Sequence, residues 1–197
     1  MEAIFYTIKT LISILVVIVP LFLIVAYVTY SERKIIGFMQ SRMGPMRVGP
    51  SGLLQPIADV LKLVSKEIII PSNANKGIFL TAPMLMLIPS LLVWSVIPLS
   101  EYFIISNINA GLLFILALTS LSVYGVILAG WATNSKYAFL GSMRSAAHII
   151  AYEIAMGFAL VGVLMLSGSL NLQNIIYAQS GSLFNWYWLP LFPLFLI

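Results

Sequence analysis

Long apolar runs are the feature of this sequence that most limits what it can fold into. A helix needs about 20 apolar residues to cross the hydrocarbon core of a bilayer. Four stretches reach that length, and they lie at residues 4–30, 78–99, 110–131 and 145–167. A fifth run, residues 186–197, has the length of about half a span. We therefore predict an all-α polytopic membrane protein with four full transmembrane helices and half of a fifth.

The composition supports a single membrane domain over residues 1–197. The chain is 61% hydrophobic and only 8% charged, whereas soluble domains carry about 25% charged residues. It has no cysteine and one histidine, so iron–sulfur clusters, cysteine-attached haem and multi-histidine metal centres lack their ligands. If the protein takes part in redox chemistry, the electrons must come from a partner or from a bound organic carrier.

The basic residues predict how the chain is oriented in the membrane. The net charge is +4, but these residues gather at the borders of the apolar runs, which indicates a topology signal rather than nucleic-acid binding. Lys9 alone lies near the membrane face opposite to the one that the remaining Lys and Arg residues share. The nine on the cytoplasmic or matrix side are Arg33, Lys34, Arg42, Arg47, Lys62, Lys66, Lys76, Lys136 and Arg144.

The first basic connection contains a short amphipathic helix. Its sequence, GPMRVGPSGLLQPIADVLKLVSKE from Gly44 to Glu67, begins with turn-forming Gly and Pro residues. Apolar residues then recur at helical spacing over about 53–66, with Asp59 and Lys62 on the opposite side. Such a helix is too short to cross a bilayer. It either lies flat at the interface with snorkelling lysines or belongs to a functional site.

Glu153 is the strongest single candidate for a functional residue. It follows Arg144 by nine residues, which places it about 13 Å into the membrane on a continuous helix. An ionisable residue at that depth is costly and marks a functional site, where it would take up and release protons. The alternative is a protonated carboxyl bonded to a neighbouring helix. His148, one turn from Arg144, is interpreted as a packing residue rather than a relay group.

Two sequence blocks resemble a known family. The first is SERKIIGFMQSRMGPMRVGPSGLLQPIADVLKLVSKE, and the second is GWATNSKYAFLGSMRSAAHIIAYEI from Gly130 to Ile154. Both are similar to subunit 1 (the H subunit in bacteria) of respiratory complex I, the proton-pumping NADH:ubiquinone oxidoreductase. The number and positions of the apolar runs between them also match. The resemblance therefore covers the whole chain.

The resemblance implies a role in quinone binding and proton movement. In this family the subunit forms most of the tunnel that ubiquinone enters from the bilayer. The matching positions imply a quinone channel lined by Arg33, Arg42, Asp59 and Lys62, and a proton path through Glu32, Asp59, Arg144 and Glu153. Two alternatives stay open, namely lipid-phosphate anchoring by the arginines and a surface ion pair between Asp59 and Lys62.

The resemblance also implies the cofactors and partners. Ubiquinone would be the substrate, while NADH, FMN and the iron–sulfur clusters would belong to partner subunits. The expected partners are the peripheral subunits that form the quinone headgroup site, adjacent small membrane subunits and lipids. The family continues into a long acidic loop and further helices that residues 1–197 do not include. We therefore expect a second chain, the product of a split gene, to supply them.

Other functions remain possible at this point. One is the ion-coupling membrane subunit of a related membrane-bound hydrogenase, and the others are a stand-alone transporter and a purely structural membrane anchor. The hydrophobicity, the N-terminus without transit-peptide features and the expected gene split favour the mitochondrial inner membrane. The bacterial plasma membrane is the alternative location.

Overall fold

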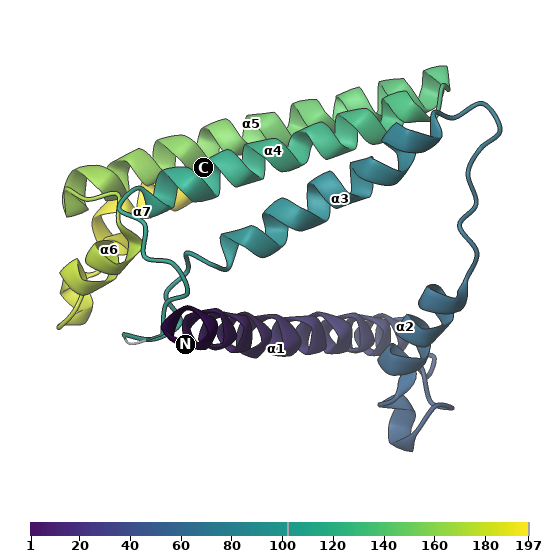
Figure 1. Cartoon of the computed structure of the whole chain (residues 1–197), viewed down its shortest axis with the longest axis horizontal. Coiled ribbons are helices and arrows are strands. Elements are labelled where there is room, and N and C mark those ends of the chain that lie inside the picture. The colour runs from purple at the N-terminus through teal and green to yellow at the C-terminus, as the bar shows by residue number, and fades with distance from the viewer. Residues whose placement is uncertain (102, 197) are drawn as a thin grey trace. The chain divides into compact units, whose positions relative to one another are not determined.

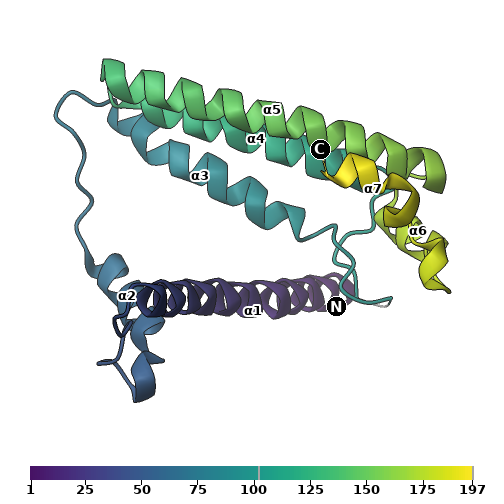
Figure 2. The same cartoon turned by 180° about the vertical axis from the view of Figure 1, so that it is seen from behind.

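The computed structural model describes residues 1–101 and 103–196, and the regular elements within them are all helical. They fall into two units (Figures 1 and 2). The first, Met1–Ile69, holds α1 (Glu2–Met39), the short 3-10 helix η1 (Pro50–Gly52) and α2 (Gln55–Ser65). The second, Ile70–Ile197, holds α3 (Lys76–Val93), α4 (Gly111–Ala132), α5 (Lys136–Ser167), α6 (Leu172–Ala178), η2 (Leu183–Asn185) and α7 (Trp188–Leu196).

Helix α1 is longer than the predicted first span. The sequence placed its end at residue 30, but the helix continues to Met39. At 1.5 Å per residue it is about 57 Å long, well beyond the hydrocarbon thickness of about 30 Å. Glu32 and Arg33 therefore lie on the last turns of a helix rather than in a connection. Glu and Arg are strong helix formers, so their charge marks a membrane border without ending the helix.

The segment after α1 folds back onto the helix. Ser41 takes a positive φ of 55° as the helix ends, and Gly52 takes a φ of 80° at the end of η1. A Cβ at Gly52 would overlap the carbonyl group of Pro45, so this position requires glycine. The Tyr30 hydroxyl donates to the Ser51 carbonyl at 2.7 Å. These constraints place α2 beside the C-terminal part of α1.

Helix α2 corresponds to the short helix predicted at 53–66. It runs from Gln55 to Ser65, with Pro56 in its first turn, where the missing N–H costs nothing. At 11 residues it is about 16 Å long, too short to span a bilayer. Its apolar side chains are exposed within the first unit, and they include Ile57, Val60, Leu61 and Val64.

In the second unit α4 packs against both α3 and α5 (Figures 1 and 2). Glycines allow the close approach. A Cβ at Gly125 would lie 2.5 Å from Met86 Cγ and 3.0 Å from the Ala82 carbonyl oxygen, both on α3. A Cβ at Gly130 would overlap the side chain of Ser142 on α5. Small residues let membrane helices bring their backbones together, so these two glycines set how closely α4 meets its neighbours.

The boundaries of α4 and the end of α5 were predicted well, whereas the start of α5 was not. Helix α4 lies within one residue of the predicted span. Helix α5 begins at Lys136, nine residues before the predicted start, and runs for 32 residues. The expected connection over 132–144 is reduced to Thr133–Ser135. As in α1, basic residues were taken as the end of a helix, although Lys and Arg are well accommodated in helices.

Helix α3 ends earlier than predicted, at Val93 instead of residue 99. Pro83 and Pro89 lie inside the helix, whereas Pro98 lies beyond it. The residue before a proline avoids helical geometry, which limits how far α3 can continue. Hydropathy did not detect this end because the residues after Val93 remain apolar.

The predicted half span at 186–197 contains α7 and Trp186, the residue that directly follows η2. A helix that the sequence did not predict precedes it. This helix, α6, begins after Asn171, whose Oδ1 accepts from Gln173 N at 2.9 Å. Asn171 is buried, and its Nδ2 donates to Asn107 Oδ1 at 2.8 Å. The side chain thus caps α6 and ties it to the connection between α3 and α4.

The opposite end of this unit carries basic residues. Asn75 N donates to the Ala132 carbonyl at 2.9 Å, so the start of α3 lies beside the end of α4. Lys76 begins α3 and Lys136 begins α5, which puts both lysines at that end. This arrangement agrees with the charge pattern, which predicts that Lys76 and Lys136 lie on the same side of the membrane.

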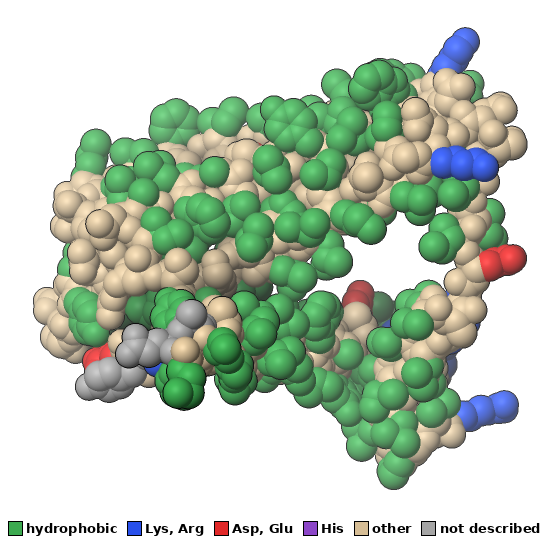
Figure 3. All heavy atoms as spheres, in the orientation of Figure 1, with side chains coloured by type: hydrophobic (Ala, Val, Ile, Leu, Met, Phe, Trp, Pro, Cys, Tyr) green, Lys and Arg blue, Asp and Glu red, His purple; other side chains and the backbone are tan. Residues whose placement is uncertain are grey.

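Apolar side chains cover the outer surfaces of the helices (Figure 3). Four helices, α1, α3, α4 and α5, are long and apolar enough to cross a membrane, and at most 17% of their most apolar windows is buried within the chain. Such surfaces require lipid or other helices around them. The predicted fold class, a polytopic α-helical membrane protein, is confirmed.

Candidate functional site

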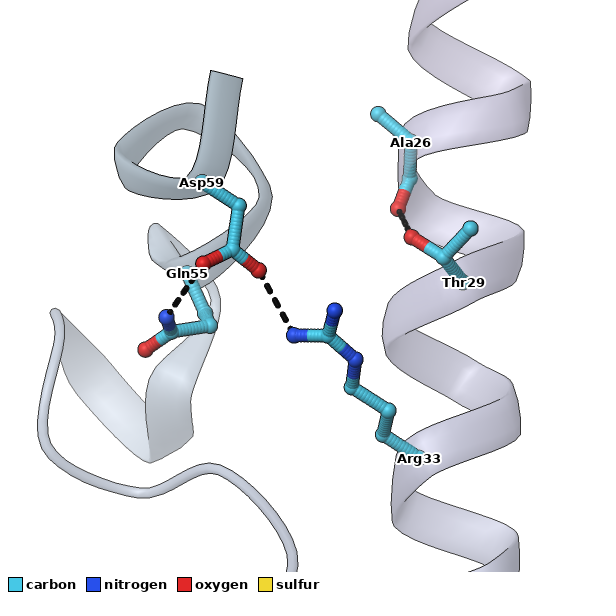
Figure 4. A network of polar contacts seen from close by, with 5 residues as sticks. All are labelled: Ala26, Thr29, Arg33, Gln55 and Asp59. Carbon is cyan, nitrogen blue, oxygen red and sulfur yellow. Dashed lines mark hydrogen bonds and ion pairs between the residues drawn. The ribbon is translucent and has the colours of Figure 1, made fainter. Parts of the chain in front are cut away.

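Arg33, Gln55 and Asp59 form a polar cluster that joins α1 to α2 (Figure 4). Arg33 Nη1 donates to Asp59 Oδ2 at 2.6 Å, and Gln55 Nε2 donates to Asp59 Oδ1 at 3.0 Å. Gln55 and Asp59 are four residues apart and therefore share one face of α2. Each carboxylate oxygen has its own donor, so the carboxylate is held in one orientation.

The two donors keep Asp59 ionised. The hydrogen bond from Arg33, and after it the one from Gln55, lowers the pKa of Asp59 below its ordinary value of 3.8. The side chains of Arg33 and Asp59 are 56% and 29% exposed. Water and salt therefore screen the pair, and it contributes little to stability. Its main effect is geometric, because it fixes α2 against α1.

The alternative interpretation of Asp59 as a surface partner of Lys62 is wrong. Within residues 1–101 and 103–196, the ion pair that Asp59 makes is with Arg33. Lys62 is exposed and acts on Asp59 only through a weaker Coulombic interaction. Spacing along α2 favoured Lys62 as the partner. However, α1 continues to Met39, which brings Arg33 close enough to pair with the Asp59 carboxylate.

Two other predicted residues of the first unit lie outside the cluster. Glu32 is exposed and neighbours Arg33 on α1, but successive residues point about 100° apart around a helix. Arg42 is exposed in the turn after α1, where its backbone N donates to the Gly37 carbonyl at 2.9 Å. No side-chain hydrogen bond or ion pair of either residue occurs in the part of the chain that the structure describes. Their roles stay predictions.

Glu153 lies near the middle of α5. The helix is continuous from Lys136 to Ser167, so Glu153 is about 26 Å from the first residue and about 21 Å from the last. Its side chain is half-buried, and the Ser120 hydroxyl of α4 donates to its Oε2 at 3.3 Å. A carboxyl thus stands at the centre of a membrane-spanning helix with a polar partner on the neighbouring helix.

A groove of about 1020 Å³ adjoins this carboxyl. Residues 149, 151–156 and 158–160 of α5 form most of its lining, and Thr119 and Ser122 of α4 contribute hydroxyl-bearing side chains. Glu153 is the ionisable carboxyl among the lining residues. The two hydroxyls also line a second groove of about 510 Å³ between α3 and α4. The carboxyl and the two hydroxyls supply the polar partners that a water molecule in this groove would need.

Arg144 and His148 lie between Glu153 and the basic end of α5. Both side chains are exposed within this chain, and the interpretation of His148 as a packing residue stays a prediction. Arg144 is two helical turns beyond Lys136, inside the helix rather than at its end. Across residues 1–101 and 103–196, no three His, Asp or Glu side chains come together as a metal site would require.

Sequence reasoning missed Gln55 and Ser120. The spacing of Gln55 to Asp59 is a detectable signal, because Gln and Asp four residues apart on a helix can form a hydrogen bond. Ser120 has no such signal. Its contact with Glu153 depends on how α4 and α5 align, and these residues are 33 positions apart in the sequence.

The comparison with protein families identifies the chain's relatives. A family model described as NADH dehydrogenase matches residues 12–197. The chain belongs to the NADH dehydrogenase family. This is the family of subunit 1 of respiratory complex I, as the two sequence blocks indicated. The polar cluster of α1 and α2 and the central carboxyl of α5 both lie within the matched residues.

Membership in the NADH dehydrogenase family establishes the chain's general context. It is a multi-pass membrane subunit of complex I, and other complex I subunits are its partners. The complex as a whole uses NADH, FMN, iron–sulfur clusters and ubiquinone.

Proposed function

We propose that this chain forms part of the quinone channel of complex I and couples ubiquinone reduction to proton translocation. The observation that carries the proposal is the Arg33–Asp59–Gln55 cluster, which stands beside the exposed apolar side chains of α2. Ubiquinone has an apolar isoprenoid tail and a polar headgroup. It therefore needs an apolar surface with a few polar groups at one end.

Arg33 is suited to contact a quinone headgroup. A guanidinium has five N–H donors, and the ion pair with Asp59 uses Nη1. The remaining donors can hydrogen-bond a quinone carbonyl and stabilise negative charge that develops on it. Asp59 and Gln55 would then hold the position of Arg33 rather than contact the quinone. Arg42 and Lys62 would supply further positive charge along the same passage.

Glu153 is suited to move protons. A carboxyl in the middle of a spanning helix is costly unless it is used, and the groove beside it offers space for water. We assign it to a proton path that also includes Glu32, Asp59 and Arg144, in which Asp59, held ionised by Arg33, contributes negative charge rather than carrying the proton. The carboxyl would take up a proton after quinone reduction and pass it along hydrated hydroxyl groups.

The two units would act as one membrane domain in the inner mitochondrial membrane. Its partners would include the peripheral subunits at the quinone headgroup and the adjacent small membrane subunits. Redox cofactors would remain on the partner subunits.

Two matched substitutions test the proposal in the assembled complex. Asp59→Asn removes the acceptor charge for Arg33, whereas Glu67→Gln removes one charge from an exposed position after α2. We expect Asp59→Asn to lower NADH:ubiquinone reduction on the order of tenfold, as for a charge-assisted hydrogen bond, with NADH oxidation by a hydrophilic acceptor unchanged. Glu67→Gln should leave both rates unchanged. Equal quinone reduction by the two variants would refute the role of the cluster.

A further inference from the structure

Ser120 differs from the other hydroxyl-bearing residues of α4. The hydroxyls of Thr119 and Ser122 donate to backbone carbonyls of their own helix, at 2.9 and 2.6 Å. Ser120 also has such a partner, the Leu116 carbonyl at 2.9 Å, but its hydroxyl lies in addition 3.3 Å from Glu153 Oε2. Ser120 therefore stands between a fixed backbone acceptor and an ionisable group.

A serine hydroxyl carries one proton and can accept as well as donate. When Glu153 is ionised, the hydroxyl can donate its proton to the carboxylate. When Glu153 is protonated, the carboxyl can donate to Ser120 Oγ while the hydroxyl donates to the Leu116 carbonyl. The same side chain thus satisfies Glu153 in both protonation states by a rotation of the hydroxyl, without movement of either helix.

The length of the contact fits a bond that changes during turnover. Hydroxyl donors usually lie about 2.5–3.0 Å from their acceptors, so the contact at 3.3 Å is long. Hydrogen bonds that serve catalysis are often long in a resting structure and shorten when charge develops. An ionised Glu153 would attract the hydroxyl, whereas a protonated one would leave it on the Leu116 carbonyl.

We propose that Ser120 is a positioning residue that orients the Glu153 carboxyl toward α4 in both of its protonation states. This inference rests on the proposed function, because it gives the proton-carrying carboxyl its hydrogen-bond partner. Without the hydroxyl, the carboxyl would lose the partner on α4 and would adopt several orientations. Proton transfer would then slow on the order of fivefold, as for the loss of one neutral hydrogen bond.

Infrared difference spectra of the assembled complex, recorded between its oxidised and reduced states, test this inference. The carboxylic C=O band that disappears in Glu153→Gln belongs to Glu153. In Ser120→Ala this band should shift, because the protonated carboxyl loses the hydrogen bond that its O–H donates to Ser120 Oγ, and proton translocation should slow by the factor given above. Ser120→Thr should restore both. Ser120→Cys keeps a side chain of similar size with a weak donor, and it should resemble Ser120→Ala.

Ser90→Ala is the matched control. Ser90 is likewise an exposed serine inside a spanning helix, and its hydroxyl donates to the Leu87 carbonyl at 2.7 Å. The Glu153 band and the rate of proton translocation in Ser90→Ala should equal those of the unmodified complex. An unshifted Glu153 band in both Ser120→Ala and Ser120→Cys would overturn the role of Ser120 alone. If no band disappears in Glu153→Gln, the proposed proton path fails, and the inference fails with it.

Discussion

Replacing Gly130 by alanine should separate α4 from α5. A Cβ at this position would overlap both side-chain atoms of Ser142 and lie 3.0 Å from the Ala138 carbonyl oxygen. The first side-chain carbon of Ser142 is fixed by its backbone and cannot rotate away. The overlap is therefore relieved only if the two helices move apart, which is the kind of overpacking that costs about 1–3 kcal/mol.

Gly141→Ala provides the matched comparison. Gly141 also lies inside a helix, but a Cβ there would meet no atom within 4 Å. Both substitutions gain about 1 kcal/mol from the higher helix propensity of alanine. This gain cancels in the comparison, so Gly130→Ala should be less stable than Gly141→Ala by about 1–3 kcal/mol. For a chain of this size that corresponds to a lower thermal midpoint by roughly 2–12 °C.

The assay is thermal inactivation of NADH:ubiquinone reduction by the assembled complex, together with proton translocation at a permissive temperature. Separation of α4 and α5 would also lengthen the Ser120–Glu153 contact, which is already 3.3 Å. Gly130→Ala should therefore slow proton translocation as well as lower the midpoint, and Gly141→Ala should do neither. Equal midpoints for the two variants would refute the close approach of α4 and α5 at Gly130.

Three further predictions concern the first unit and the cap of α6. Because the pKa of Asp59 is lowered, its pairing with Arg33 is lost only as the pH falls through that lowered value, below 3.8. The ratio of quinone-reduction activity between the unmodified complex and Asp59→Asn should therefore stay constant between about pH 5 and 8. Asn171→Ala should destabilise the chain by about 1–2 kcal/mol through loss of the α6 cap, as measured by the thermal midpoint. Gly52→Ala should block assembly on native gels, because the position combines a φ of 80° with overlap of the Pro45 carbonyl.

Each of these predictions has its own control. A ratio that falls between about pH 8 and 5 would show that Asp59 titrates near neutrality, contrary to its lowered pKa. Asn174→Ala changes an exposed asparagine of the same segment and should shift stability by less than about 0.5 kcal/mol. A shift as large as that of Asn171→Ala would contradict the cap. Gly77→Ala, whose Cβ would lie 3.6 Å from Asn75 Oδ1, should assemble normally, and normal assembly of Gly52→Ala would refute the steric argument.

The sequence predicted those parts of the fold that local patterns determine. The apolar run of α4 is bounded by polar residues on both sides, so its limits were found within one residue. The short helix α2 followed from its Gly/Pro-rich start and its helical periodicity. The end of α1 and the start of α5 were misplaced because charge was read as a helix boundary, whereas charge reports the membrane border and helix boundaries depend on capping and on positive φ.

The contacts between helices were beyond what the sequence could predict. The sequence offered Lys62, its neighbour along α2, as an alternative partner for Asp59, while the structure pairs Asp59 with Arg33, 26 positions away. The partner of Glu153 on α4 depends on the alignment of α4 with α5, which the close approach at Gly130 helps to determine. Helix α6 was missed because seven residues are too few to produce a clear hydropathy signal.

Proton translocation by the Glu153→Gln variant decides whether this carboxyl carries protons. Acidification and NADH:ubiquinone reduction would be measured together on the assembled complex in sealed vesicles, with Glu101→Gln, an exposed carboxyl outside the helices, as the control. The account predicts that Glu153→Gln loses proton translocation at least about tenfold, as expected for removal of a proton-transfer group, while Glu101→Gln behaves like the unmodified complex. Normal proton translocation by Glu153→Gln would contradict the account.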